Sequence, residues 1–241
     1  ASGGFNINFT NTGSMGFNGQ RGARTLTLSG NSANDNTLAA VIGDNGGATS
    51  VTKTGNGVWV LSGANTYTGA TTVTGAIALK VTSLANGGSA SSIGASSNDA
   101  SNLVLNGGTF TYTGGTVSTD RLFSLGTSGI TLNMFGTGGV TFTNTGSMGF
   151  NGQTGARTLT LANSNGGAST IAAVIGDNGG ATSVTHTLVS STWILTGANT
   201  YTGTTTINGG VLSVTSLANG GSASGIGAAS SAASNLVLNG G

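Results

Sequence analysis

The sequence predicts an all-β protein, and within that class a right-handed parallel β-helix (β-solenoid). Three observations support this prediction: a long internal repeat, a composition with 46 Gly but no Pro or Cys, and short alternating runs separated by turn residues. Helix formers are scarce, while Thr, Val, Ile and Leu dominate the runs, which favours strands. Each run holds few apolar residues and the turns are many. A solenoid with a narrow apolar stripe therefore suits the chain better than a sandwich of two domains.

The internal repeat is clearest in the decapeptide NTGSMGFNGQ, which stands at residues 11–20 and again at residues 144–153. The same offset in residue number relates Phe9 to Phe142, Arg24 to Arg157, Asp44 to Asp177 and Asn102 to Asn235. The offset is larger by one between Trp59/Trp193 and Thr74/Asn208, and it then returns to its first value. Both changes fall in Gly- or Ser-containing stretches, where turns absorb an inserted or lost residue. Self-similarity over a fixed period indicates a repeat architecture.

The repeat divides the chain into three parts of one continuous solenoid. Residues 1–108 form the first repeat unit, residues 109–138 form connecting coils that occur once, and residues 139–241 form the second unit. At roughly 20–25 residues per coil, one period is expected to hold about six coils and to rise about 28 Å, and the whole chain about 50 Å. The Ser/Ala/Gly-rich segments at 83–101 and 216–234 interrupt the alternation. They are either loops that leave the solenoid or loosely patterned coils.

The expected strands are short runs bounded by Gly, Asn, Asp or Ser, with no helical window between them. In chain order they are RTLTL at 24–28, TSVTK at 49–53, VWVL at 58–61, NLVL at 102–105, TFTYT at 109–113, ITLNM at 130–134 and VTFT at 140–143. Successive side chains on a strand point to opposite faces, so Leu26 and Leu28 share one face of the first run.

Comparison of the two copies orients the run VWVL. Val58 becomes Thr192 in the second copy, whereas Trp59 and Leu61 are retained. We therefore expect the Trp59/Leu61 face in the core, and we expect the face of Val58 and Thr192 to tolerate water.

Composition and charge exclude several classes of function. The net charge is +1 and only 5% of the residues are charged, against about 25% in an average soluble protein. Arg21 and Arg24 form the densest positive spot, which we interpret as a solvated strand edge, so we expect no nucleic-acid partner. No run approaches the roughly 18 apolar residues of a membrane helix, so we expect no direct membrane insertion by this segment. Residues 1–9 have neither a positive region nor an apolar core, so we expect no signal peptide there.

The carboxylates do not form a catalytic pair in the expected fold. Glycoside cleavage normally needs two carboxyl groups about 5–9.5 Å apart. Asp44 and Asp177 occupy the same position one period apart, in the turn sequence IGDNGG, and Asp35 and Asp99 lie in loop-like stretches. The remaining carboxylate, Asp120, precedes Arg121, and we interpret the two as a local surface pair. We therefore predict that the chain is not an enzyme.

The single histidine gives no sign of a metal or nucleophile site. His186 corresponds to Lys53 in the first copy, which indicates a solvent-facing strand position. Zinc sites and nucleophile–base pairs need partner residues that this chain does not contain. The sequence GDNGG occurs once per period, which is not the spacing of calcium-binding nonapeptide repeats. We expect no catalytic, cofactor-binding or metal-binding residues, and no cofactor.

Residues 53–79, KTGNGVWVLSGANTYTGATTVTGAIAL, and residues 191–212, STWILTGANTYTGTTTINGGVL, closely resemble the autotransporter-associated β-strand repeat, a passenger repeat family. The positions that match its pattern are Leu61, Ser62, Gly63, Asn65, Thr66, Tyr67, Thr68, Gly69, Thr71 and Thr72, and in the second copy Leu195, Gly197, Asn199, Thr200, Tyr201, Thr202, Gly203, Thr205 and Thr206. LVLNGG, at 103–108 and 236–241, resembles the strand that usually follows. The second copy departs from the pattern at 187–190, which lacks the opening Gly-x-Gly.

The resemblance implies a right-handed β-helix in a large secreted or surface-displayed bacterial protein, where such repeats form stalk or passenger segments. It also implies structural roles within the coil for Trp59, Leu61, Asn65, Tyr67 and Gly69, and for Trp193, Leu195, Asn199, Tyr201 and Gly203. The expected location is therefore extracellular, at the bacterial cell surface.

Two non-enzymatic functions remain open: a rigid spacer or fibre segment, and an adhesin that binds glycans or other cell-surface material. Sugar sites need exposed aromatic rings beside polar groups. Tyr67 and Tyr201 belong to the repeated motif, so the predicted binding surface is Phe110, Tyr112 and Phe123, in the segment that occurs once, residues 109–138. An ice-binding face would need Thr-x-Thr at one fixed short spacing, which the sequence does not keep. We favour the structural function.

The two ends of the chain lead to an expectation about partners. Neither ASGGFNINF nor LVLNGG offers a polar capping helix, an edge proline or an edge lysine. A β-helix without caps exposes an open strand edge and an apolar stripe at each end. We therefore expect head-to-tail stacking with itself or with neighbouring repeats. Such a contact propagates as a filament because it is heterologous and does not close.

Overall fold

The structure is a computed structural model that describes residues 5–164 and 167–240. The first four residues of the first expected unit, residues 165–166 and the last residue of the second unit lie outside the described part. The described residues form the strands β1 (Asn8–Phe9), β2 (Arg24–Leu28), β3 (Asp35–Leu38), β4 (Thr49–Lys53), β5 (Val58–Leu61), β6 (Thr71–Thr74), β7 (Ala78–Val81), β8 (Leu103–Asn106), β9 (Thr109–Tyr112), β10 (Val117–Thr119), β11 (Ser124–Leu125), β12 (Ile130–Met134), β13 (Val140–Phe142), β14 (Arg157–Asn163), β15 (Ala168–Ile171), β16 (Thr182–His186), β17 (Thr192–Leu195), β18 (Thr205–Ile207), β19 (Val211–Val214) and β20 (Leu236–Leu238), and the 3₁₀ turns η1 (Ala100–Asn102) and η2 (Ala233–Asn235).

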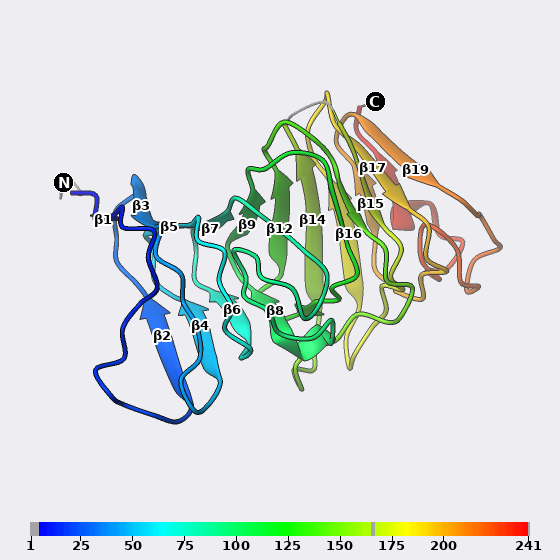
Figure 1. The fold of residues 1–241 in the computed structure, drawn as a ribbon. Helices are drawn as coiled ribbons and strands as arrows, with labels where there is room; N and C mark the ends of the chain where they lie inside the picture. The colour runs from blue at the N-terminus through cyan, green and yellow to red at the C-terminus, as the bar shows by residue number, and fades with distance from the viewer. Residues whose placement is uncertain (1–4, 165–166, 241) are drawn as a thin grey trace.

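These strands form three sheets in which every pairing between the described strands is parallel. The long sheet has the order β1-β3-β5-β7-β9-β12-β14-β16-β18-β20. The N-terminal sheet has the order β11-β8-β6-β4-β2, and the C-terminal sheet has the order β10-β13-β15-β17-β19. Figure 1 shows the strands stacked side by side along the molecule, from the blue N-terminal end to the red C-terminal end.

One coil visits all three sheets. The chain passes from β9 in the long sheet to β10 in the C-terminal sheet and to β11 in the N-terminal sheet, and it returns to the long sheet as β12 beside β9. Parallel strands that stack coil upon coil in this way make a parallel β-helix, so the predicted fold class is confirmed. Coil length varies, because the interval from Trp59 to its neighbour Leu79 is much shorter than that from Thr71 to its neighbour Leu103.

The two repeat units are rotated relative to each other about the solenoid axis. β2 and β4 belong to the N-terminal sheet, whereas their counterparts β14 and β16 belong to the long sheet. From β2 the chain reaches the long sheet at β3, about a third of a turn later, and then completes five coils to β14. One period is therefore about five and one third coils, and the expectation of about six is wrong. Equivalent surface features of the two units face directions about a third of a turn apart.

The core consists of inward side chains stacked in columns. Because parallel strands pair in register, Trp59, Leu79, Phe110, Leu132 and Leu161 are successive neighbours on the long sheet. All five are buried. Full burial of such a side chain stabilises the fold by about 1.5–3 kcal/mol, so the column contributes a large share of the stability.

The expected strands coincide with observed strands to within one residue at each end. The expected orientation of β5 is half correct. Trp59 and Leu61 face the core, but Val58 is only 6% exposed. The reason is an ion pair between Lys80 Nζ on β7 and Asp35 Oδ1 on β3, 2.8 Å apart, which crosses the outer face of the intervening β5.

The Ser/Ala/Gly-rich segments are folded parts of the solenoid. An isolated antiparallel bridge joins each segment to the preceding motif asparagine, Ser91 to Asn65 in the first unit and Ser224 to Asn199 in the second. Each ends in a 3₁₀ turn before the next strand. Among the described residues, no helix has the length and apolar character needed to cross a bilayer.

Candidate functional site

The aromatic side chains predicted to form a binding surface lie in the core. Phe110, Tyr112 and Phe123 are 0%, 3% and 1% exposed. Phe110 and Tyr112 occupy the inward positions of β9, and the ring of Phe123 packs against that of Phe142 with centroids 5.7 Å apart. The Tyr112 hydroxyl donates to the carbonyl of Gly115, at 2.9 Å. The prediction of an exposed aromatic surface is therefore wrong, because alternation on β9 directs Phe110 and Tyr112 toward the axis and Phe123 packs on a core ring.

The residues of the repeated motif build the inside of each coil. Trp, Leu, Asn and Tyr of the motif are buried in both copies, as Trp59, Leu61, Asn65, Tyr67, Trp193, Leu195, Asn199 and Tyr201. The motif glycines, Gly69 and Gly203, allow close approach of neighbouring coils. A Cβ at Gly69 would collide with the carbonyl of Thr49, which accepts the Gly69 N–H at 3.0 Å.

Asn65 joins three successive coils through its side chain and backbone. Its Oδ1 accepts the N–H of Ile42 in the preceding coil, at 2.8 Å, and its Nδ2 donates to the carbonyl of Ser92 in the following coil, at 2.9 Å. Its backbone exchanges hydrogen bonds with Ser91. Asn199 repeats this arrangement. The amide is fully buried and both ends of it are satisfied, which is the condition for a polar group inside a core.

The motif tyrosines are held by threonines of the next strand. The Tyr67 hydroxyl lies 2.6 Å from Thr71 Oγ1, and the Tyr201 hydroxyl lies 2.7 Å from Thr205 Oγ1. Burial raises the pKa of Tyr201 to about 12, and it raises the pKa of Tyr67 as well. Both phenols therefore stay protonated at any physiological pH and serve as packing groups.

The turn aspartates cap the same motif from outside. Asp44 Oδ1 accepts the N–H of Thr49 at 2.7 Å, and its Oδ2 accepts the N–H and the hydroxyl of Thr68, at 3.1 and 2.6 Å. Burial raises the pKa of Asp44, but the hydrogen bonds from Thr68 and Thr49 outweigh this effect and hold the pKa below its usual value. Asp177 has the same contacts in the second unit, with Thr182 and Thr202. The expected role in a turn is what the structure shows.

The repeated decapeptide ends in a tight turn. Asn18 and Gly19 have φ angles of +46° and +74°, and the N–H of Gln20 donates to the carbonyl of Phe17 at 2.8 Å. Two central residues with positive φ define a type I′ turn, for which Asn-Gly is the preferred sequence. Residues 150–153 form the same turn.

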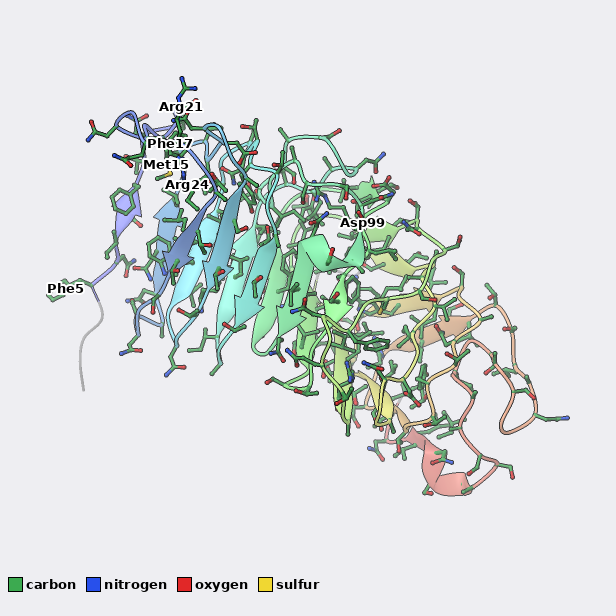
Figure 2. The ribbon with its side chains drawn as sticks, turned by 90° about the horizontal axis from the view of Figure 1, so that it is seen from below. Phe5, Met15, Phe17, Arg21, Arg24 and Asp99 are labelled. Atoms are coloured by element: carbon green, nitrogen blue, oxygen red, sulfur yellow. The ribbon has the colours of Figure 1, made fainter. Side chains whose placement is uncertain are left out.

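An arginine fastens this turn to the solenoid. The guanidinium carbon of Arg24 lies 4.2 Å from the centre of the Phe17 ring, and Nη2 donates to three backbone carbonyls. Figure 2 shows Met15, Phe17 and Arg24 gathered at one corner near the N-terminal end, with Arg21 beside them. Arg157 makes the equivalent stack on Phe150. The interpretation as a solvated strand edge holds for exposed Arg21 but is wrong for Arg24, which is half-buried.

The position of Lys53 and His186 is buried, and the prediction of a solvent-facing site is wrong. Both residues take the last inward position of their strands. Lys53 Nζ reaches the carbonyls of Thr54 and Gly55 in the following turn, at 3.0 and 3.1 Å. His186 Nε2 lies 2.7 Å from the hydroxyl of Ser191, in the turn that is one residue longer. The replacement of Lys53 by His186 at this position therefore goes together with a following turn that is one residue longer in the second unit.

Burial of His186 leads to a pH prediction. Burial lowers the pKa of His186 below 6.5, and a backbone hydrogen bond at Gly209 opposes part of this shift. Between the folded-state pKa and 6.5, the unfolded chain binds more protons than the folded chain, so stability is full above pH 6.5 and falls as the pH falls. Thermal unfolding should show a lower Tm at about pH 5.5 than at about pH 7.5. His186→Gln should remove most of this difference. An equal drop in both proteins would contradict the assignment.

Asp120 and Arg121 are not the expected surface pair. Arg121 is 2% exposed, and its guanidinium lies inside the loop of residues 83–98. Asp120 binds the outside of the same loop, where its Oδ1 accepts the N–H of Gly87 at 2.7 Å. The two side chains lie on opposite sides of the loop, and only the carboxylate is near the solvent.

The side chains that could carry chemistry stay apart in the described residues, where no three His, Asp, Glu or Cys groups come together as a metal site. Two regions, residues 51–77 and 190–214, match the model of the passenger-associated transport repeat. They contain the buried Asn and Tyr of the coil motif and the strands on both sides of it. This chain carries two passenger-associated transport repeats.

A curated relative matches most of this chain. The adhesin BmaC autotransporter of Brucella suis biovar 1 (strain 1330) is 47% identical over 211 residues, which cover 86% of this chain and 6% of that protein. The chain thus corresponds to a small part of that relative. No solved structure matches it significantly. The expected repeat family and the expected extracellular location at the cell surface are confirmed, and the chain is a passenger segment.

Proposed function

We propose that this passenger segment is a structural spacer whose coils stack end to end with further coils, and that it is not an enzyme. The observation that carries the proposal is a comparison of equivalent residues. Side chains at the two ends of the solenoid are exposed, whereas their counterparts inside it are buried. The buried counterpart of each exposed end residue therefore shows which side chains a neighbouring coil would cover.

Among the described residues, side chains at the N-terminal end are left uncovered. Phe9 is 54% exposed, whereas its counterpart Phe142 is 2% exposed. Arg157 Nη1 donates to the carbonyl of Leu125 in the preceding coil, at 2.6 Å. The equivalent atom, Arg24 Nη1, is buried and has no hydrogen-bond partner among the described residues. β2 is also the edge strand of its sheet, so its backbone is open to a further strand.

The C-terminal end shows the same contrast. Three leucines are exposed although their counterparts are buried: Leu217 (71% against 6% for Leu84), Leu236 (41% against 2% for Leu103) and Leu238 (69% against 0% for Leu105). Covering each such side chain stabilises an assembly by about 1.5–3 kcal/mol. Both ends thus favour a further coil, either of the same polypeptide or of another molecule.

The rotation of the repeat also favours a spacer. A surface that binds through repeated sites needs those sites on one face. The period of five and one third coils instead turns the decapeptide loop and the Asp44 turn away from their second copies. The repeated features stabilise coils wherever they face, which is the property a stalk requires.

End-to-end stacking is tested by blocking one end. We expect the isolated chain to form linear assemblies that lengthen with concentration and persist at raised salt, because backbone hydrogen bonds and apolar contacts are only weakly screened. Leu236→Lys combined with Leu238→Lys should shorten them severalfold in light scattering and negative-stain micrographs. Val189→Lys, which changes an exposed side loop, serves as the control. A wild-type chain that stays monomeric at high concentration would contradict stacking between molecules.

Adhesion is the second candidate, since the 47% identical relative is an adhesin. The surface best suited to it is a column of threonines on the outer face of the long sheet, where Thr109, Thr131, Thr160, Thr185 and Thr206 are successive neighbours. These residues are unevenly spaced in the sequence, but the register aligns them. Selective binding on a glycan array that is lost in Thr160→Ala/Thr185→Ala, and kept in Thr52→Ala/Thr72→Ala on the N-terminal sheet, would favour adhesion over the spacer.

A further inference from the structure

The first Ser/Ala/Gly-rich loop, residues 83–98, encloses an arginine side chain. Arg121 comes from the following coil and is 2% exposed. Its guanidinium donates to the carbonyls of Ala85 (3.2 Å) and Gly94 (2.9 Å), to the hydroxyl of Ser96 (2.8 Å) and, at 3.5 Å, to the carbonyls of Ser89 and Ser97. None of these partners is a carboxylate. The loop therefore binds the guanidinium through hydrogen bonds from the planar N–H groups of the arginine to uncharged oxygen atoms of the loop.

The two residues before Arg121 dock on the same loop. Thr119 Oγ1 donates to the carbonyl of Ala85 at 2.8 Å. Asp120 accepts the N–H of Gly87 at 2.7 Å and a hydrogen bond from Asn98 Nδ2 at 3.1 Å. The segment Thr-Asp-Arg thus binds the loop as a unit, with the cation inside and the anion on the rim.

The equivalent loop of the second unit, residues 216–231, is built in the same way. Gly221 N–H donates to the carbonyl of Ala229 at 2.8 Å, as Gly88 N–H does to Ser96. Gly221 and Gly227 have φ angles of +85° and +84°, close to the values at the corresponding glycines of the first loop. The carbonyl groups that hold Arg121 in the first loop are therefore prearranged in the second.

Where the first loop holds the Arg121 side chain, the second loop borders a cavity that is open to solvent. The cavity has a volume of about 510 Å³. Its lining includes Ala218, Gly227, Ala229 and Ser230, which are the counterparts of four residues that bind Arg121. All four arginines of the sequence lie elsewhere, at positions 21, 24, 121 and 157.

We propose that the loop of residues 216–231 is a guanidinium socket, and that it takes the arginine of a Thr-Asp-Arg segment in the coil that stacks on the C-terminal end. The arginine would donate to the carbonyls of Ala218 and Gly227, and the aspartate would accept the N–H of Gly220. The socket deepens the proposed stacking function and rests on the form of it in which the next coil belongs to the same polypeptide, because the first coil of a second copy has no Thr-Asp-Arg segment. It gives the stacked coil a fixed rotational register, which apolar contacts alone do not provide.

A peptide with the sequence of residues 109–125 tests the socket, because it contains the Thr-Asp-Arg segment and the strands equivalent to the next coil. Added to the full chain, it should bind measurably in calorimetry and slow amide exchange in residues 216–231. The same peptide with Arg121→Gln should bind at least tenfold more weakly, since it loses charge-assisted hydrogen bonds. Ala229→Ser in the chain restores the hydroxyl that Ser96 provides in the first loop, so it should tighten binding of the Arg peptide but not of the Gln peptide.

The possible results distinguish failure of the guanidinium socket from failure of end-to-end stacking. Equal affinity of the Arg and Gln peptides, with exchange slowed in β20 but not in the loop, would overturn the socket and leave end-to-end stacking intact. Absence of binding by either peptide would also overturn the socket, while light scattering of the chain alone would still report on stacking. Arginine-dependent binding that Ala229→Ser strengthens is the result the geometry predicts.

Discussion

Replacing Trp193 with alanine is expected to lower the free energy of unfolding of the C-terminal coils by about 3–5 kcal/mol, the usual cost of truncating a buried aromatic side chain. Trp193 faces the axis from β17 and is 0% exposed. Its indole fills space between coils that a methyl group leaves empty. Because each coil contacts mainly its neighbours, the loss should stay local and leave the N-terminal coils unchanged. Denaturant unfolding combined with amide exchange measures both the size and the extent of the effect.

Substitution by phenylalanine separates packing from hydrogen bonding at the two tryptophans. The indole N–H of Trp59 donates to the carbonyl of Ser29 at 2.9 Å. That of Trp193 has no partner among the described residues. Trp193→Phe should therefore cost much less than Trp193→Ala, and Trp59→Phe should additionally lose a hydrogen bond. Equal losses for Trp193→Phe and Trp193→Ala would show that the ring does not fill the core as described.

Asn65→Ala should cost about 2–6 kcal/mol, because it leaves two buried backbone groups unpaired at about 1–3 kcal/mol each. Those groups are the N–H of Ile42 and the carbonyl of Ser92, on opposite sides of the asparagine. Urea unfolding measures the loss, and Ala64→Ser, at the exposed neighbouring position, provides the control. A change smaller than about 1 kcal/mol in Asn65→Ala would mean that water or another side chain replaces the amide.

The sequence was informative about strands because two signals agree there. Alternation fixed the runs, and the second copy showed that Trp59 and Leu61 are retained while Val58 is not. The same alternation, carried two positions beyond Val51, places Lys53 inside. The sequence does not reveal that a lysine or histidine can be buried there, because its hydrogen-bond partners are backbone carbonyls and a serine hydroxyl of the next turn.

Other features depend on the path of the chain between strands. The rotation of the repeat follows from the unequal lengths of the coils, which the period of the sequence does not reveal. Phe110 is buried because it lies between Leu79 and Leu132 of the two neighbouring coils. These residues are far from Phe110 in the sequence. Arg121 becomes a core residue because a loop of the preceding coil closes over it.

Amide hydrogen exchange on a lengthened chain tests whether both ends of the solenoid receive another coil. Since residue 241 corresponds to residue 108, the array continues if a second copy of residues 109–241 follows residue 241. In the original chain the amides of β19 and β20 should exchange quickly, whereas those of their counterparts β7 and β8 should be protected. In the lengthened chain β19 and β20 should become as protected as β7 and β8. Exchange in β19 and β20 that stays fast, with the added residues unprotected, would show that the C-terminal end does not receive another coil.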